Sequence, residues 1–384
     1  MFNRSLMPYI QQIAKKYPIV TLLGPRQSGK TTLVRAAFPH KTYVNMEDAE
    51  NRALAALDPK AFMQRYPEGA IFDEVQRTPH LLSYIQVRVD ELDQKGMFIL
   101  TGSHQAELHS AVAQSLAGRT SILRLLPLSL SEMRNANIRD CLETIILKGG
   151  YPKIYKENLP ISNAYSSYCQ TYVERDVRQI LQIKDIIQFE RFIKLTASRI
   201  GQLINYASLA ADVGVSAVTI KEWIAVLEAT YILVRLEPYF ENFGKRMIKS
   251  PKLYFTDTGL ACYLLGIDTP EQLVRDPLYG NIFENWVVLE LMKGRYNQGV
   301  DPRFYFYRDV SGKEVDLLMQ QGSHLMPIEI KSSKTFSTSF LEGLHYFHEQ
   351  APKRAVGGVL IYGGDQTQQL GTFQLINAEN CSQL

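Results

Sequence analysis

Short apolar runs alternate with longer amphipathic stretches over the first third of the chain. The runs PIVTLL (18–23), GAIF (69–72) and GMFIL (96–100) have the length and composition of buried strands. Between them, DAENRALAAL (48–57) and LLSYIQVRVDEL (81–92) place apolar residues at helical spacing. This alternation predicts an α/β fold in which helices cover both faces of a parallel sheet.

A glycine-rich loop, GPRQSGKT (24–31), follows the first strand and leads into a helical stretch. Strand, loop and helix in this order match a phosphate-binding loop (Walker A). Gly24 and Gly29 allow a tight turn whose N–H groups face the phosphates. Lys30 supplies positive charge to the β- and γ-phosphates, and the Thr31 hydroxyl can ligate Mg²⁺. The predicted nucleotide-binding residues are Gly24, Pro25, Arg26, Gln27, Ser28, Gly29, Lys30, Thr31 and Thr32.

Acidic and hydroxyl side chains follow the next two strands. Asp73 and Glu74 come directly after the second apolar run. We expect Asp73 to hold Mg²⁺ and Glu74 to orient the attacking water. Ser103 follows the third run and has two interpretations, a contact to the γ-phosphate and the water, or a turn residue.

The middle of the chain is predicted to form helices followed by two strands. Residues 149–190 are helix-rich, as in a lid or linker. Ser208 is predicted to open a short helix, Gly214 to end it and Ser216 to cap a second helix, which is a helix-turn-helix pattern. Two strands around a basic turn then predict a winged helix. The basic residues of this turn are Lys245, Arg246, Lys249 and Lys252.

This winged helix has two open interpretations, DNA binding and protein packing. In the first, the second helix and the basic turn contact the phosphate backbone. The exposed positions of that helix include Thr219, Lys221 and Glu222. One lysine beside one glutamate is a weak phosphate-binding surface, so DNA is a candidate partner that the sequence does not settle.

The C-terminal part carries a spaced set of charged residues. The stretch 280–298 is predicted as an amphipathic helix with Glu284, and EVDLLMQ (314–320) as a strand with Asp316. The next strand carries Glu329 and Lys331, which share one face because two positions separate them.

This pattern resembles the PD-(D/E)XK nuclease superfamily. The resemblance implies Mg²⁺ held by Asp316 and Glu329, a water positioned by Lys331 and a further contact from Glu284, a set suited to phosphodiester hydrolysis. Two alternatives stay open. One is a nuclease fold without activity, and the other is a strand pair joined by a salt bridge.

Composition limits the expected cellular location of the protein more than it limits its function. The chain has 384 residues, 46% hydrophobic and 21% charged, with a net charge of +3, which does not by itself indicate nucleic acid. No apolar run reaches the roughly 18 residues that span a bilayer, and residues 1–16 lack the pattern of a signal peptide. The four cysteines show no metal or disulfide spacing. We therefore expect a cytoplasmic protein without a membrane partner.

Motifs along nearly the whole chain resemble one family. They include GPRQSGKTTL, IFDEVQ, ILTGSHQ, GGYP, SPKLYFTDTGL, FENWVVLEL and GKEVDLLM. The sequence is similar to prokaryotic AAA+ ATPases whose C-terminal half is a domain of unknown function. The resemblance implies ATP and Mg²⁺ as ligands, hydrolysis of ATP, and a protein partner that the family leaves undefined.

AAA+ ATPases usually complete the active site with an arginine from a neighbouring subunit, which implies a homo-oligomer. Arg119 follows the third strand and is the first candidate, with a surface or salt-bridged arginine as the alternative. Arg124, Arg175 and Arg178 are its rivals. The resemblance and the patterns together predict an AAA+ domain at 1–148, a helical linker at 149–190, a winged helix at 191–265 and a nuclease-like domain at 266–384.

Two functions remain open from the sequence. The first is an ATPase coupled to DNA processing through the winged helix and the nuclease-like domain. The second is a nucleotide-controlled binding switch whose C-terminal domain only docks.

Overall fold

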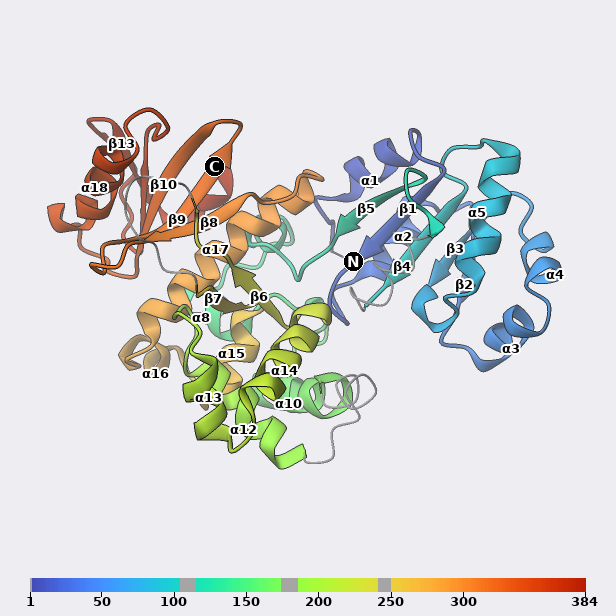
Figure 1. The fold of residues 1–384 in the computed structure, drawn as a ribbon, viewed down its shortest axis with the longest axis horizontal. Coiled ribbons are helices and arrows are strands. Elements are labelled where there is room, and N and C mark those ends of the chain that lie inside the picture. Colours follow the sequence, from blue (N-terminus) through green and yellow to red (C-terminus); the bar gives the residue numbers. More distant parts are fainter. Residues whose placement is uncertain (1, 104–114, 174–185, 241–249) are drawn as a thin grey trace.

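The computed structural model describes residues 2–103, 115–173, 186–240 and 250–384. Its N-terminal lobe is built on a parallel sheet of order β2-β3-β4-β1-β5 (Figure 1). The strands are β1 Ile19–Leu23, β2 Thr42–Asn45, β3 Ala70–Asp73, β4 Phe98–Gly102 and β5 Thr120–Arg124. Every pairing in this sheet is parallel. The predicted α/β architecture of this part is confirmed.

Alternate residues of β1 pack against helices on opposite faces of the sheet. Val20 and Leu22 belong to the core formed with α1 and α2, while Ile19 and Leu23 belong to the core on the other face, with α4 and α5. The helices of this lobe are α1 Met7–Ala14, α2 Lys30–Ala37, α3 Ala49–Leu57, α4 Pro59–Gln64, α5 Leu81–Leu92 and the short 3₁₀ turn η1 Val75–Arg77. Burial of β1 on both faces explains its uninterrupted run of apolar and β-branched residues.

The middle part is a set of helices that ends in a two-stranded antiparallel sheet, β6–β7. Its elements are α7 Leu130–Asn135, α8 Leu142–Lys148, α9 Pro152–Lys156, α10 Ile161–Tyr168, the π-helical turn η2 Cys169–Val173, α12 Ile186–Ala197, α13 Tyr206–Val213, α14 Ala217–Ala229, β6 Leu233–Leu236 and β7 Lys252–Phe255.

Two of the three predicted helix boundaries in this part are confirmed. Gly214 ends α13 in the left-handed conformation, and the Ser216 side chain accepts the Thr219 N–H at the start of α14. The prediction for Ser208 was wrong, because Asn205 is the N-cap of α13 and its side chain accepts the Ser208 N–H. Asparagine and serine both cap helices well, so spacing alone did not separate them.

The predicted basic turn is only partly within the described residues. Lys245, Arg246 and Lys249 lie outside them. Lys252 is described, and it is buried rather than exposed on a turn. The expectation that Lys252 belongs to a basic exposed surface was therefore wrong.

The C-terminal part packs a mixed sheet of order β12-β13-β11-β10-β9-β8 against a long helix, α17. Its strands are β8 Phe304–Arg308, β9 Glu314–Gln321, β10 His324–Lys331, β11 Val359–Tyr362, β12 Gln368–Leu370 and β13 Phe373–Asn377. Its helices are α15 Thr258–Leu265, α16 Pro270–Arg275, α17 Tyr279–Asn297, α18 Glu342–Gln350 and the 3₁₀ segments η3 Thr338–Leu341 and η4 Ala378–Gln383. None of the described helices is long and apolar enough to cross a bilayer.

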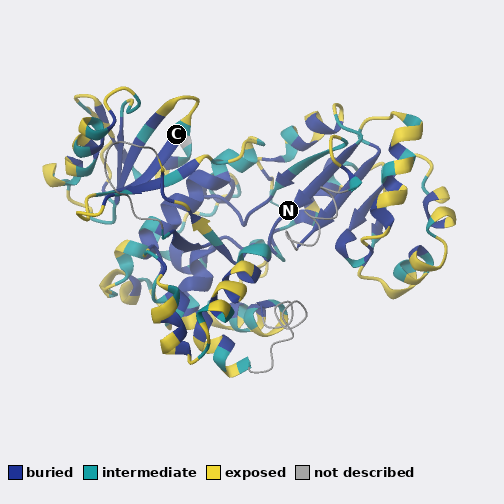
Figure 2. Cartoon of the chain, in the orientation of Figure 1, coloured by how far each residue is buried: buried dark blue, intermediate teal, exposed yellow. Residues whose placement is uncertain are grey.

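Helix α17 corrects another expectation. The sequence predicted an amphipathic helix, but an unbroken stretch from Asn285 to Lys293 is buried. The helix contacts β5 of the N-terminal lobe, α8 of the middle part, and α15 and β10 of the C-terminal part. Figure 2 shows it in the buried colour through the centre of the molecule. Its polar residues face other parts of the protein instead of solvent.

Candidate functional site

The glycine-rich loop leaves the carboxyl end of β1 and enters α2 in the geometry that its sequence predicts. Gly24 lies so close to the chain after β5 that an added Cβ would stand 2.1 Å from the Leu125 carbonyl oxygen. Gly29 caps α2 with φ +94°, a conformation that favours glycine. Both glycines are therefore required by the backbone itself. The first N–H groups of α2 stand at the loop, where they can bind an anion.

Lys30, the first residue of α2, folds back over the loop that precedes it. Its ammonium group donates to the carbonyl oxygens of Gly24 and Pro25, both at 2.9 Å. Lys30 as a whole residue is 5% exposed. A positive charge is thus held against the loop where a phosphate would bind.

Asp73, at the carboxyl end of β3, accepts hydrogen bonds from three hydroxyl groups. Thr31 donates to Oδ2 at 2.8 Å and Tyr43 donates to the same oxygen at 2.6 Å. Thr101, at the end of β4, donates to Oδ1. The Thr31 hydroxyl and the Asp73 carboxylate are hard oxygen donors side by side next to the phosphate-binding loop, so these residues fit Mg²⁺.

Glu74 follows Asp73 in a left-handed backbone conformation with φ 57°. Its carboxylate accepts hydrogen bonds from Gln76 and from Ser103, the latter at 2.8 Å. Burial disfavours its charged form, but Lys30 and these donors outweigh burial and hold the pKa of Glu74 below its ordinary value. Glu74 is therefore ionised at neutral pH, and Ser103 donates a hydrogen bond to its carboxylate.

A cavity of about 340 Å³ opens between the loop and the middle part of the chain. One wall consists of loop residues and Glu74. The opposite wall consists of Pro152, Lys153, Lys156, Glu157 and Tyr172. The sequence patterns did not point to this wall, although the spacing of the two lysines in YPKIYK places them on one helix face.

The loop also rests on a buried ion pair that the sequence did not reveal. Arg4 pairs with Glu132 at 3.1 Å, and their side chains are 5% and 0% exposed. The Arg4 guanidinium also donates to the carbonyl oxygens of Ser28, in the loop, and Leu126. The N-terminal segment thus holds the backbone of the phosphate-binding loop through the hydrogen bond from Arg4 to Ser28.

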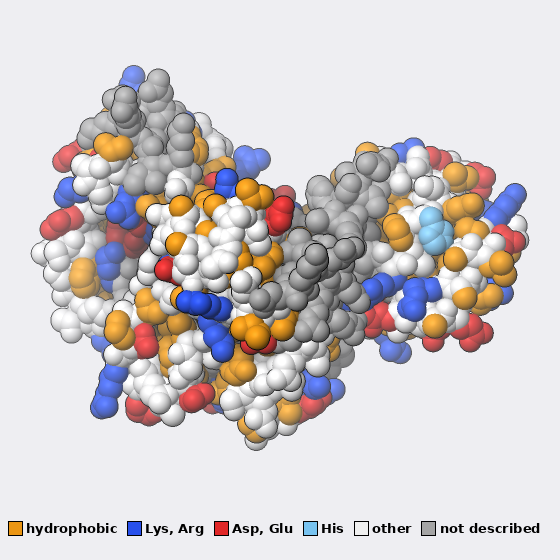
Figure 3. Space-filling model, turned by 60° about the horizontal axis from the view of Figure 1, so that its bottom comes forward, with side chains coloured by type: hydrophobic (Ala, Val, Ile, Leu, Met, Phe, Trp, Pro, Cys, Tyr) orange, Lys and Arg blue, Asp and Glu red, His pale blue; other side chains and the backbone are white. Residues whose placement is uncertain are grey.

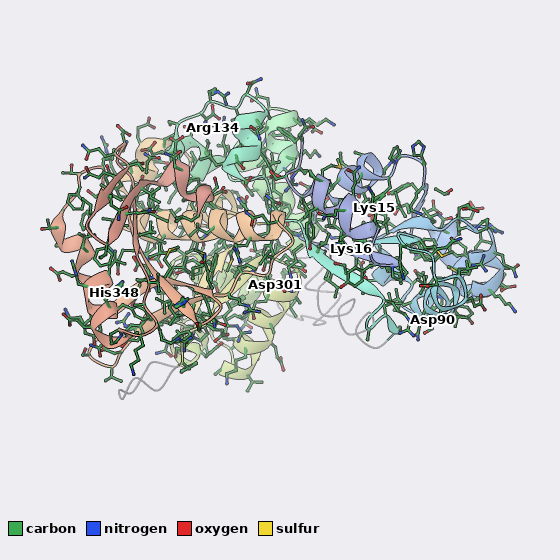
Figure 4. All side chains as sticks on the ribbon, turned by 90° about the horizontal axis from the view of Figure 1, so that it is seen from above. Lys15, Lys16, Asp90, Arg134, Asp301 and His348 are labelled. Carbon is green, nitrogen blue, oxygen red and sulfur yellow. The ribbon has the colours of Figure 1, made fainter. Side chains whose placement is uncertain are left out.

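Arg119 lies at the amino ends of the strands, whereas the phosphate-binding loop lies at their carboxyl ends. Its neighbour Thr120 is in register with Ile19 at the amino end of β1, whereas the loop follows the carboxyl end. Arg119 pairs with Asp90 of α5, and Figure 4 shows Asp90 on the N-terminal lobe, away from the C-terminal sheet. Arg119 therefore cannot complete the site of its own chain, and its role toward a neighbouring subunit stays a prediction.

The rival arginines are in different positions. Arg124 lies over the Tyr296 ring and pairs with Asp301, which Figure 4 shows near the place where the N-terminal lobe meets the rest of the molecule. Arg175 and Arg178 lie outside the described residues.

The four predicted residues of the C-terminal part do come together. Lys331 donates to Asp316 Oδ2 at 3.0 Å and to Glu329 Oε2 at 2.6 Å, between the neighbouring strands β9 and β10. Glu284 of α17 lies beside this group and accepts from Tyr254 and from Lys252 at 3.0 Å. Lys252, Tyr254 and Glu314 were not predicted for this cluster.

The donor set of this cluster does not fit a divalent metal. All the carboxylates of the cluster already contact an ammonium group, either Lys252 or Lys331. Burial opposes ionisation of Asp316, but Lys331 and Lys252 keep its pKa below the usual range. Burial and the adjacent Asp316 charge raise the pKa of Glu329 well above its usual range. Lys331 therefore compensates the charge of Asp316, and the raised pKa of Glu329 favours its protonated form.

Comparison with known proteins gives matches along most of the chain. A family described as "AAA domain" matches residues 16–134. Two families described as domains of unknown function, DUF8612 and DUF4143, match residues 139–271 and 279–381. The uncharacterized proteins Rv2008c of Mycobacterium tuberculosis and Mb2031c of Mycobacterium bovis are each 31% identical over 344 residues, which cover 88% of this chain and 75% of theirs.

Two solved structures show more distant similarity. The Walker-type ATPase PABY2304 of Pyrococcus abyssi aligns with a TM-score of 0.48 and 15% identity, over 69% of this chain and 96% of that one. A signal-transduction ATPase of Pyrococcus horikoshii with a tetratricopeptide repeat sensor, PH0952, aligns with a TM-score of 0.27 and 13% identity, over 76% and 47%. At these scores neither structure carries functional information for this chain.

Proposed function

The chain belongs to the family of the mycobacterial proteins Rv2008c and Mb2031c, and we propose that its AAA domain binds ATP with Mg²⁺ and hydrolyses it. The observation that carries this proposal is the arrangement of Lys30, Thr31, Asp73 and Glu74 around the phosphate-binding loop. It joins a cation for the phosphates, oxygen ligands for a metal and an ionised carboxylate at one edge of the sheet.

Each of these residues has a separate task in the proposed reaction. The backbone N–H groups of the loop and Lys30 bind the β- and γ-phosphates. Thr31 and Asp73 would hold Mg²⁺, which neutralises charge on those phosphates when it is bound. Glu74 accepts a hydrogen bond from the attacking water and orients it, and Ser103 keeps the Glu74 carboxylate in place.

The proposal is tested by separating binding from hydrolysis. Glu74→Gln keeps the shape of the side chain but cannot act as a base, so ATP should stay bound while turnover falls about 10²–10⁴-fold. Asp73→Ala should instead weaken binding of Mg²⁺ and ATP. Glu50→Gln, an exposed carboxylate on α3, is the matched control and should change neither quantity. Equal loss of binding in the Glu74 and Asp73 variants would contradict this division of roles.

The described residues of α14 and β7 favour a binding switch over DNA processing as the use of this ATPase. On the face in Figure 3, Lys and Arg side chains of the described residues are scattered among acidic and hydrophobic ones. Lys221 and Glu222 are both exposed on α14, and Lys252 is not available to a phosphate backbone. We infer that the α13–α14 unit and the β6–β7 pair form a winged helix that packs against protein.

Binding to duplex DNA is the direct test of that inference. Salt-dependent binding that is lost when Lys245 and Arg246 become glutamate would contradict the packing role and restore the DNA-coupled function. Absence of such binding at low salt is the expected result.

A further inference from the structure

Lys252 occupies a position that its sequence neighbourhood did not suggest. Its side chain is 3% exposed, and its ammonium lies 3.0 Å from Glu284 Oε1 and 2.5 Å from Glu314 Oε1. It also lies over the ring of Phe306, 5.6 Å from the ring centre. These contacts join β7, α17, β9 and β8 through one buried positive charge.

Lys331 completes the same cluster from its solvent side. Its side chain is 32% exposed, and it bridges Asp316 and Glu329. We use the term C-terminal cluster for Lys252, Glu284, Glu314, Asp316, Glu329 and Lys331. Buried carboxylates repel one another unless cations lie between them. Here the two ammonium groups, together with the Arg308 guanidinium 2.8 Å from Glu314, lie among the four carboxylates.

A metal nuclease would fill this space with a divalent ion instead. Mg²⁺ requires near-octahedral oxygen ligands at roughly 2.0–2.1 Å. In the C-terminal cluster, Glu284 and Glu314 direct oxygens at Lys252, and Asp316 directs one at Lys331 and at the Ile330 N–H. Within the described ranges, no group of three or more His, Cys, Asp or Glu side chains is arranged to hold a metal ion.

Backbone contacts tie the same segments together. The Tyr239 N–H donates to the Phe306 carbonyl at 2.7 Å, and the Phe306 N–H donates to the Glu237 carbonyl at 3.1 Å. The chain after β6 is thus bonded to the edge strand β8, next to Lys252. The ion pairs of Lys252 and these backbone hydrogen bonds therefore stabilise the same interface, between the β6–β7 pair and the C-terminal sheet.

We propose that Lys252 and Lys331 together take the place of the divalent cation of a PD-(D/E)XK nuclease, since Lys331 contacts Asp316 and Glu329 and Lys252 contacts Glu284. The C-terminal cluster is then a metal-independent ion-pair centre that fixes the β6–β7 pair to the C-terminal sheet. The C-terminal part is accordingly a docking unit that does not cut nucleic acid. This inference goes beyond the ATPase proposal and does not depend on it.

The test measures melting temperature with and without millimolar Mn²⁺, in the absence of nucleotide and in an Asp73→Ala background. That background removes the carboxylate that would hold a metal at the ATPase site beside Thr31. With Lys252 present, Mn²⁺ should leave the melting temperature unchanged. Lys252→Met should lower the melting temperature, and Mn²⁺ should then raise it by about 2 °C or more, because a cation now relieves the carboxylates. Adding Asp316→Ala should remove that rise.

Lys313→Met, at an exposed lysine between β8 and β9, is the matched control and should show neither effect. A Mn²⁺ response in the chain that keeps Lys252, abolished by Asp316→Ala, would overturn the proposal, as would Mn²⁺-dependent cleavage of DNA by that chain. A folded Lys252→Met chain without any Mn²⁺ response would also overturn it. If this variant does not fold, a Mn²⁺ titration of the chain with Lys252 decides: no bound ion supports the proposal and a bound ion refutes it. ATP turnover, measured in parallel without the Asp73 change, reports separately on the ATPase proposal.

Discussion

Arg4→Met should destabilise the N-terminal lobe more than any surface charge removal. The substitution keeps an apolar stem of similar length but removes the guanidinium that pairs with Glu132 at 3.1 Å. Breaking a buried pair by removing one partner costs about 3–5 kcal/mol, because the other charge stays buried. Glu132 keeps the N–H groups of Ser5 and Ser129 as donors at 2.7 and 3.0 Å, which moderates that loss.

Two carbonyl oxygens lose their donor in the same variant. Those of Ser28 and Leu126 each accept from Arg4, and an unsatisfied buried acceptor costs about 1–3 kcal/mol. The Ser5 and Ser129 donors to Glu132 offset part of these costs, so we expect a total loss of at least about 3 kcal/mol. For a unit of 150–250 residues, roughly 2–4 °C of melting temperature corresponds to each kcal/mol, so the lobe should melt at least about 6 °C lower. Because Ser28 belongs to the phosphate-binding loop, ATP affinity should fall as well.

Differential scanning calorimetry and nucleotide titration measure the two effects. Lys95→Met, which breaks the exposed pair with Asp93, is the matched control and should cost less than about 1 kcal/mol. Adding Glu132→Gln to Arg4→Met should recover part of the loss, because it removes the uncompensated charge. A melting temperature of Arg4→Met within about 1 °C of wild type would refute the reasoning, since that slope equates 1 °C with less than about 0.5 kcal/mol.

Three further outcomes follow from the nucleotide site. Lys30→Ala should abolish ATP hydrolysis in a turnover assay, and unchanged turnover in a clean preparation would remove the ATPase assignment. Arg119→Ala should bind ATP but hydrolyse it slowly, and mixing it with Lys30→Ala should restore activity, because one subunit would give the loop and the other the arginine. A monomer with full turnover would exclude such sharing. Lys156→Ala should weaken ATP binding several-fold, because it removes positive charge from the cavity wall. Lys148 pairs with Asp140 outside that wall, so Lys148→Ala is the control and should leave ATP binding unchanged.

Features that depend on neighbouring residues could be predicted from the sequence. The phosphate-binding loop needs only a strand, two glycines and a helix in succession, and Gly24 and Gly29 have the conformations that this order demands. The acidic pair after β3 was predicted for the same reason, since carboxyl ends of parallel strands meet at one edge. Tyr43, which donates to Asp73, was missed because its proximity depends on the strand order β2-β3, and the sequence does not give that order.

Helix α17 shows that a polar residue in the sequence does not reliably indicate exposure to solvent. Asn285 is fully buried, and its amide donates to the Phe255 carbonyl at 2.8 Å and accepts the Phe255 N–H at 2.7 Å. Glu290 accepts the Leu130 N–H and pairs with Lys293. In the sequence these side chains mark an outward face, because polar groups without partners avoid burial. The partner of Asn285, Phe255, is 30 residues away in the chain, and the partner of Glu290, Leu130, is 160 residues away. The local pattern therefore predicted the wrong environment for both side chains.

Lys252 is a second polar residue whose environment the sequence did not predict, and its burial bears on the function of the C-terminal part. In the sequence it closes a run of basic residues, and a charge run is usually solvated, so an exposed basic turn was predicted, with DNA binding and protein packing both left open. Burial of a lysine is tolerated only when carboxylates surround it, and those of Glu284 and Glu314 are 32 and 62 residues further along the chain. Asp316 and Glu329 were predicted to hold a metal, with a further contact from Glu284, because the sequence shows which groups carry negative charge but not which positive group neutralises them. The identity of that positive group decides between a metal-dependent nuclease and a docking unit, and it depends on tertiary contacts.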